Sequence, residues 1–170
     1  METLMLTTTR RSFLVLGAAA TLSACAATIP MLPKGTSTPE TLSDGEILAA
    51  INAVRQANGA PAWAYNDRLE AAARAQARLM AEKNTLSHDL GVTLRQRVTA
   101  AGYLGAVGEN LAKGYTNLQG TIEGWMTSSG HRSTLLNAKF TEFGLAMARG
   151  PGGKLYWAMI AGGSFEPWLQ

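Results

Sequence analysis

A single cysteine, Cys25, constrains this chain more than any other feature of its sequence. With one thiol, no disulfide can form within the chain and no cysteine-based metal site can be built, so the fold must be held by packing alone. The 170 residues are 46% hydrophobic and 16% charged, which is typical of one globular domain with a sizeable core. The net charge of +3 is scattered along the chain. The charge pattern therefore does not indicate a nucleic-acid-binding protein.

The position of Cys25 indicates export and lipidation. Two arginines precede an apolar stretch at residues 13–20, which is too short to span a bilayer but is typical of the core of a signal peptide. The string Leu-Ser-Ala-Cys at residues 22–25 resembles a lipobox, the signal for attaching lipid to the cysteine and for cleavage before it. Residues 9–14, Thr-Arg-Arg-Ser-Phe-Leu, resemble a twin-arginine export signal. We expect residues 1–24 to be a lipoprotein signal peptide, exported by the twin-arginine or the general secretory route, rather than an uncleaved anchor helix.

The residues after Cys25 are expected to tether a domain to a membrane. Residues 25–40, beginning with the lipidated cysteine, include prolines, threonines and a glycine, a composition typical of a flexible linker. Lipid chains on Cys25 would make the attachment effectively permanent. Ala26 stands where an aspartate is associated with retention in the inner membrane, so the outer membrane is favoured in a cell with two membranes. The sequence predicts a lipid-anchored protein of the bacterial cell envelope, periplasmic or otherwise outside the cytoplasm, with one domain at residues 41–170.

Hydrophobic periodicity divides this domain into helices followed by strands. Apolar spacing and capping signals predict four helices, at about 43–58, 67–82, 93–102 and 118–126. The first two open with capping boxes, Ser43 to Glu46 and Asp67 to Glu70. Apolar runs then predict strands at about 107–112, 143–147 and 155–160. Helices first and an antiparallel sheet late indicate the α+β class.

Two histidines and one glutamate are the candidate functional residues. His88 follows the second predicted helix, His131 follows the fourth, and Glu109 stands beside a glycine at the start of an apolar segment. All three lie at the ends of elements, where binding groups are commonly presented. Two imidazoles and a carboxylate make a reasonable ligand set for Zn²⁺ or a similar divalent ion. Spacing alone leaves open whether they share one site or are three separate surface or capping residues, because no local ligand motif joins them.

Several motifs occur together in a distinctive order. They are Ser87-His88, Gly108-Glu109-Asn110-Leu111, Gly-Trp-Met-Thr-Ser-Ser-Gly-His-Arg at residues 124–132, Leu135-Leu136-Asn137, and Phe-Thr-Glu-Phe-Gly at residues 140–144. Together they resemble a bacterial CAP domain, also called an SCP domain, of the superfamily of cysteine-rich secretory proteins, antigen 5 and pathogenesis-related 1 proteins. The resemblance covers nearly all of residues 41–165. It implies a CAP-type α-β-α sandwich, in which an antiparallel sheet is flanked by helices.

The resemblance also implies one shared cleft. His88, Glu109 and His131 would converge there as ligands of Zn²⁺ or another divalent metal, with Ser128 and Asn110 lining the cleft. Family members with a full set of four residues carry a second acid three positions after the tryptophan, and here that position is Ser128. A hydrolytic metal site needs enough ligands to hold the ion and a separate general base. Without the second acid, Glu109 cannot fill both roles.

Two functions from different classes follow. The incomplete acid set and the membrane tether favour a non-enzymatic binding module for a small apolar ligand such as a sterol or fatty acid, a divalent metal, or a cell-wall or protein partner. The alternative is a metal-assisted, peptidase-like hydrolase of peptide or cell-wall material, with His88 and His131 as ligands and Glu109 as base. In both cases the chain contacts a membrane through lipid on Cys25, and no nucleic acid is expected as a partner.

Overall fold

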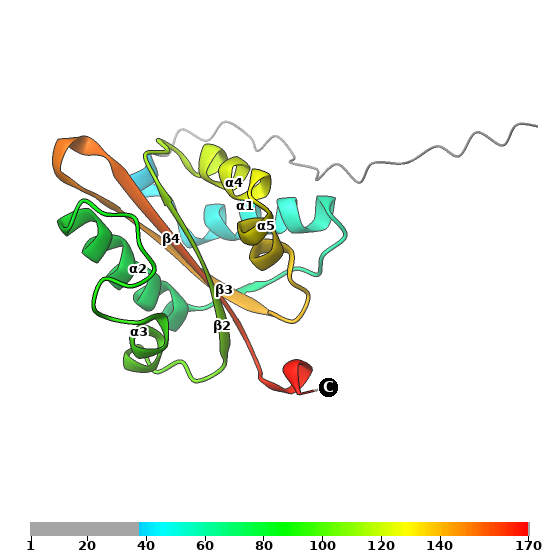
Figure 1. Cartoon of the computed structure of the whole chain (residues 1–170). Helices are drawn as coiled ribbons and strands as arrows, with labels where there is room; N and C mark the ends of the chain where they lie inside the picture. Colours follow the sequence, from blue (N-terminus) through cyan, green and yellow to red (C-terminus); the bar gives the residue numbers. More distant parts are fainter. Residues whose placement is uncertain (1–37, 170) are drawn as a thin grey trace, which may run out of the picture.

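The structure, a computed structural model, describes residues 38–169, and their middle layer is a four-stranded sheet (Figure 1). The strands are β1 (Ala64–Tyr65), β2 (Ala106–Lys113), β3 (Glu142–Arg149) and β4 (Leu155–Gly163), in the order β1-β3-β4-β2. β4 pairs antiparallel with β2 and β3, whereas the two-residue β1 pairs parallel with β3. The expected antiparallel sheet is therefore confirmed for its three long strands, and β1 makes the sheet mixed. The predicted signal peptide, the lipidated Cys25 and most of the tether lie outside the described residues.

β4 is a central strand, and all nine of its residues are buried. A strand with neighbours along both edges and helices over both faces has no polar side. This position explains the continuous apolar run that predicted a strand here. β1 and β2 lie at the two edges of the sheet.

The described α-helices cover both faces of the sheet. On one face lie α1 (Asp44–Ala57), α4 (Leu118–Thr127) and α5 (Ser129–Leu136), and on the other lie α2 (Asp67–Glu82) and α3 (Leu94–Ala100) (Figure 1). The predicted α-β-α sandwich is thus confirmed. Short 3₁₀ turns occur at Pro39–Thr41, Pro151–Gly153 and Glu166–Trp168. Within residues 38–169, no helix has the length and apolar character needed to cross a membrane.

Reciprocal hydrogen bonds fix the starts of α1 and α3. Ser43 and Glu46 form the predicted capping box at α1, and Thr93 forms a second box with Gln96 at α3. Each box satisfies amide groups that have no partner inside the helix. Both helix starts therefore follow from residues close together in the sequence.

At α2 the capping residue is Asn66, not the predicted Asp67. The Oδ1 atom of Asn66 accepts hydrogen bonds from the amides of Arg68 and Leu69, at 2.9 and 3.2 Å. The backbone of Asn66 is extended, as a cap requires, whereas Asp67 is already the first helical residue. The predicted capping box was therefore wrong by one residue, although the helix itself is confirmed.

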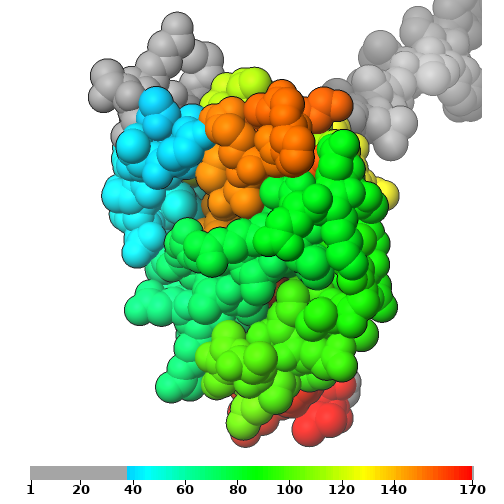
Figure 2. Space-filling model, turned by 90° about the vertical axis from the view of Figure 1, so that its left-hand side faces the viewer, coloured from blue at the N-terminus to red at the C-terminus, as the bar shows by residue number. Residues whose placement is uncertain are grey.

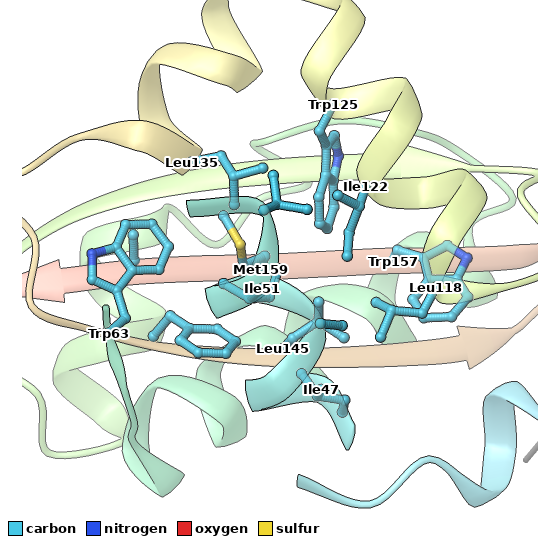
Figure 3. Close-up of a cluster of buried hydrophobic side chains, with 14 of the residues drawn as sticks. Ile47, Ile51, Trp63, Leu118, Ile122, Trp125, Leu135, Leu145, Trp157 and Met159 are labelled. Atoms are coloured by element: carbon cyan, nitrogen blue, oxygen red, sulfur yellow. The ribbon is translucent and has the colours of Figure 1, made fainter. Parts of the chain in front are cut away.

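Two hydrophobic clusters hold the layers together, one on each face of the sheet. The cluster beneath α1, α4 and α5 contains Trp63, Trp125 and Trp157, all of them buried (Figure 3). The cluster beneath α2 and α3 is rich in alanine. The described members of both clusters come from residues 42–161.

The alanine-rich face lets α2 approach the sheet closely. Gly144 of β3 lies beneath the first turn of α2, where an added Cβ would overlap the backbone of Leu69 and Glu70. Backbone atoms cannot rotate aside as a flexible side chain can. This contact therefore requires glycine at position 144.

A buried arginine ties α1 to the end of α5. Arg55 lies with its guanidinium carbon 3.7 Å from the ring centre of Trp63, and donates hydrogen bonds to the carbonyl oxygens of Pro61, Leu135 and Asn137. Burial lowers the pKa of Arg55 to about 10. These contacts anchor the C-terminal end of the helix that carries one of the candidate site residues.

Candidate functional site

The candidate site lies along β2, an edge strand. Side chains alternate between the two faces of a strand. Glu109 faces α2 and α3, where it pairs with Arg97, and Asn110 faces the opposite layer, where its Nδ2 donates to the carbonyl oxygen of His131 at 2.8 Å. Because β2 is at the edge, residues from both helical layers can meet beside it.

Both carboxylate oxygens of Glu109 are occupied. Oε1 accepts a hydrogen bond from Nη2 of Arg97 at 2.6 Å, and Oε2 lies 2.8 Å from Nδ1 of His88. The side chains of Glu109 and Arg97 are only 2% and 3% exposed, so the two residues form a buried ion pair. A buried carboxylate requires such a partner, because it loses the stabilisation that water would give its charge.

Arg97 is the site residue that sequence reasoning missed. Its Nη1 also donates to the backbone carbonyls of His88 and Val92 in the loop between α2 and α3. Arg97 therefore holds the loop that carries His88 as well as the carboxylate of Glu109. A signal was present in its spacing, because Arg97 lies three residues after Leu94 on the inward side of α3, where an arginine is unusual.

His88 is exposed but held in place. Gln76 of α2 donates a hydrogen bond to the carbonyl oxygen of Ser87 at 2.5 Å, and the Ser87 hydroxyl donates to that of Asp89 at 2.7 Å. With 62% of the His88 side chain exposed and Nδ1 directed at Glu109, Nε2 is the ring nitrogen left for a ligand.

His131 lies within α5, not in a loop after α4. Ser128 ends α4 and precedes α5, and its side chain makes no capping hydrogen bond. Burial lowers the pKa of His131, and the charge of His88 lowers it further. A lowered pKa favours the neutral imidazole, which is the form that binds metal ions.

Asn110 is fully buried, and one of its polar atoms is unsatisfied. Its Oδ1 has no hydrogen-bond partner among the described residues, although its Nδ2 is bonded to His131. A buried acceptor of this kind usually has a partner, such as an ordered water. Asn110 therefore adds a hydrogen-bond acceptor beside the two histidines.

One group of acidic side chains has the close spacing that a metal ion requires. Among residues 38–169, the three side chains whose ligand atoms all lie within 4.8 Å of one another are Asp44, Asp67 and Glu70, at the starts of α1 and α2. Acidic groups there also offset the helix dipoles. This cluster has the spacing of a cation site but holds none of the metal ligands that the sequence predicted.

The predicted metal set does not form such a group. Arg97 occupies one oxygen of Glu109 and His88 the other. Glu109 does not fit as a metal ligand while its pair with Arg97 stays closed. The role of Glu109 as a metal ligand stays a prediction that requires this pair to open.

Two hollows in the surface lie elsewhere. They have volumes of about 320 and 240 Å³, and Arg149 near the β3–β4 turn lines both. Neither is lined by His88, Glu109 or His131. The chemistry-bearing residues are therefore not in these hollows.

Comparisons with known proteins give matches across most of the chain. Residues 48–160 match the model of the cysteine-rich secretory protein family, CAP. The chain is 30% identical over 130 residues to the uncharacterized protein YkwD of Bacillus subtilis, and 30% identical over 115 residues to the uncharacterized membrane protein YlbC of the same organism. These matches cover 74% and 65% of this chain but 51% and 33% of the relatives. The chain thus spans about half of the first relative's length and less of the second's.

Solved structures show the same fold. An outer surface protein from Borrelia burgdorferi matches with a TM-score of 0.62 and 23% identity, over 69% of this chain and 90% of that one. An extracellular protein containing an SCP domain from Bacillus anthracis matches with a TM-score of 0.65 and 23% identity, over 74% and 43%. At 23% identity, both likenesses bear on the fold alone.

Proposed function

The chain belongs to the cysteine-rich secretory protein (CAP) family, and from that premise we propose that it is an envelope-anchored lipoprotein that binds a partner without chemically changing it. The partner is a small apolar ligand, a divalent metal, or a cell-wall or protein component. The observation that carries the proposal is the closed set of contacts around Glu109.

A hydrolase would need a base that can accept a proton from water. Glu109 is the acid that the family motif supplies, and its two oxygens are paired with Arg97 and His88. With both oxygens engaged and the side chain buried, neither oxygen is left to hydrogen-bond a water molecule at the site. Ser128 stands where fuller family members carry the second acid, so the motifs supply no other acid to take over as base.

The same contacts suit a binding role for the histidines. When a histidine binds a metal, its other ring nitrogen commonly donates to a carboxylate, which fixes the ring. His88 has this arrangement, with Nδ1 at Glu109, and His131 adds a second imidazole. A bound divalent ion would supply Lewis-acid character. With two imidazoles as its ligands, we expect weak binding.

The cellular location is part of the proposal. The Borrelia relative is called an outer surface protein and the Bacillus anthracis relative an extracellular protein. These names, together with the lipobox around Cys25, support a lipid-anchored protein outside the cytoplasm, on the outer membrane if the cell has two. In cells, Cys25→Ala should leave an uncut precursor without lipid. Normal processing and labelling of this variant would rule out the anchor.

Thermal unfolding of the fragment 38–170 tests the binding role. A ligand present at 100 times its Kd stabilises a protein by about 2.7 kcal/mol, so a true ligand raises the melting temperature. The ligands are a sterol, a fatty acid, cell-wall fragments and Zn²⁺. We expect one of them to raise it, and His88→Ala and His131→Ala to weaken the shift. Leu86→Ala, an exposed change in the same loop, is the matched control.

Turnover assays on peptides and wall fragments test the alternative hydrolase. The proposal expects no turnover, with or without metal. Turnover that is lost in Glu109→Gln, while circular dichroism shows a folded variant, would establish the hydrolase and overturn the proposal. Absence of both turnover and any thermal shift would remove the ligand part of the proposal.

A further inference from the structure

Four large apolar side chains are exposed at one end of the molecule. Leu104 follows α3, and Phe165, Trp168 and Leu169 follow β4, with exposed fractions from 41% for Trp168 to 82% for Leu169. We call these four residues the terminal patch. Figure 2 shows the red C-terminal segment beside the yellow-green loop at the lower end of the molecule.

Contacts join the members of the terminal patch. Arg95 bridges its two segments, because its Nη1 donates to the carbonyl of Gly105, next to Leu104, and its guanidinium lies 5.8 Å from the ring centre of Phe165. The amide of Trp168 donates to the carbonyl of Phe165 at 2.9 Å, which closes a 3₁₀ turn. Arg95 therefore links the two segments that carry the patch.

Basic side chains surround the terminal patch. Arg95 lies over Phe165, and Lys139 lies 4.8 Å from the ring centre of Trp168. Arg68 is nearby, donating to the carbonyl of Gly102 in the loop that carries Leu104. On the C-terminal segment, the one described acid is Glu166. Beside Leu104, Glu142 accepts a hydrogen bond from Tyr103, so these three cations face two described acids.

We propose that the terminal patch docks this domain onto an anionic lipid surface. Exposed tryptophan, phenylalanine and leucine side chains flanked by arginine and lysine suit the boundary between acyl chains and headgroups. The apolar tips would enter this boundary, and the cations would contact anionic headgroups. The patch protrudes, with Leu104 and Leu169 most exposed, and a protruding surface fits a membrane better than it fits a protein groove.

The orientation of the domain rests on the lipid anchor of the proposed function. The tether enters near Glu40, which pairs with Arg149 just before β4, whereas Phe165 lies just past the other end of β4. The nine residues of β4 span roughly 30 Å at about 3.3 Å per residue. Thirteen steps from Cys25 to Thr38 reach about 45 Å when extended. The tether can therefore reach along the strand and let the patch touch the membrane that holds the anchor.

Vesicle binding by the fragment 38–170, which lacks Cys25, tests the patch separately from the anchor. We expect sedimentation with phosphatidylglycerol vesicles at low salt, at least tenfold weaker binding to phosphatidylcholine, and release at high salt. Phe165→Ser with Trp168→Ser should lower binding at least tenfold, and Arg95→Gln with Lys139→Gln should remove the preference for anionic lipid. Leu86→Ser is the control, because Leu86 is equally exposed but lies outside the patch.

Tryptophan fluorescence gives a second readout that needs no destabilising change. Trp63, Trp125 and Trp157 are already buried, so a blue shift on adding vesicles must come from Trp168. The shift should disappear in Trp168→Phe. Failure of the wild-type fragment to bind anionic vesicles would overturn the proposal, as would equal binding by the patch variants. A dimer that Trp168→Ser abolishes, without vesicle binding, would assign the patch to a second copy instead.

Discussion

Arg97 and Glu109 are each the other's charged partner, and neither side chain is accessible to water. Removing one member of a buried pair leaves the other charge without a partner. This typically lowers the free energy of unfolding by about 3–5 kcal/mol. We therefore expect Arg97→Met or Glu109→Gln to lower the free energy of unfolding by about this amount in urea titrations.

The double variant Arg97→Met with Glu109→Gln separates the cost of an unpaired charge from that of lost packing. It removes both charges, so it should cost clearly less than the sum of the two single changes. A cost near zero for either single change would show that the pair is not buried in solution. Because Glu109→Gln is expected to weaken the fold, His88→Ala is the better probe of the site.

His131 should make stability depend on pH. Its pKa is lowered in the folded state by burial and by the charge of His88, so the folded protein binds this proton less tightly than the unfolded chain. The free energy of unfolding should then fall as the pH drops below about 6.5, the ordinary histidine value, and level off below the folded pKa. Urea titrations from pH 7.5 to 5, with a chelator present, should show a smaller loss of unfolding free energy for His131→Gln than for the wild-type protein. Identical slopes for the two proteins would contradict the prediction.

Helix starts could be predicted where the signal is local, and elements defined by distant contacts could not. The boxes at Ser43 and Thr93 involve residues three positions apart, so the sequence displays them directly. β1 is two residues long and exists through pairing with β3, which lies nearly 80 residues later. α5 is mostly polar, and Leu135 is its one buried residue, so its sequence lacks the helical spacing of apolar residues that would predict it.

The start of α2 offers a test with a built-in control. Asn66 caps two amides, and its Nδ2 donates to Glu142 at 2.6 Å, so Asn66→Ala should lower the free energy of unfolding by about 1–2 kcal/mol. Asp67→Ala should cost less than about 0.5 kcal/mol, since it removes only a favourable charge near the helix start. Thermal or urea unfolding distinguishes them. A larger loss of stability for Asp67→Ala than for Asn66→Ala would show that Asp67 is the capping residue.

At the scale of the whole molecule, the layers could be predicted but the contents of the site only in part. The motif order indicated the sandwich, and the structure brings His88 to Glu109 and Asn110 to His131. The motifs did not include Arg97, because nothing in a linear pattern shows that α3 lies beside β2. Its pairing with Glu109 becomes visible only once the two elements are packed together.

Close packing between layers predicts a severe effect of one methyl group. Gly144→Ala would press a Cβ into the backbone at the start of α2, so we expect a loss of about 3 kcal/mol or more, with a lower melting temperature. Gly130→Ala is the matched control, because nothing lies within 4 Å of its Cβ position in α5. It should be neutral or stabilise by up to about 1 kcal/mol. Equal melting temperatures for the two variants would show that α2 does not rest on Gly144.

The central position of β4 also determines when the sheet can form during synthesis. Every strand pair except the two-residue β1–β3 contact includes β4, yet β4 is the last of the described strands to be made. A nascent chain that ends before Leu155 carries all five described α-helices and no partner for β2. At about 5–20 residues per second, the ribosome adds the nine residues of β4 in roughly 0.5–2 seconds, and the sheet can close only after that. During that interval the two hydrophobic clusters lack the central strand that both of them pack against, so the growing chain exposes apolar surface until residue 163 is made.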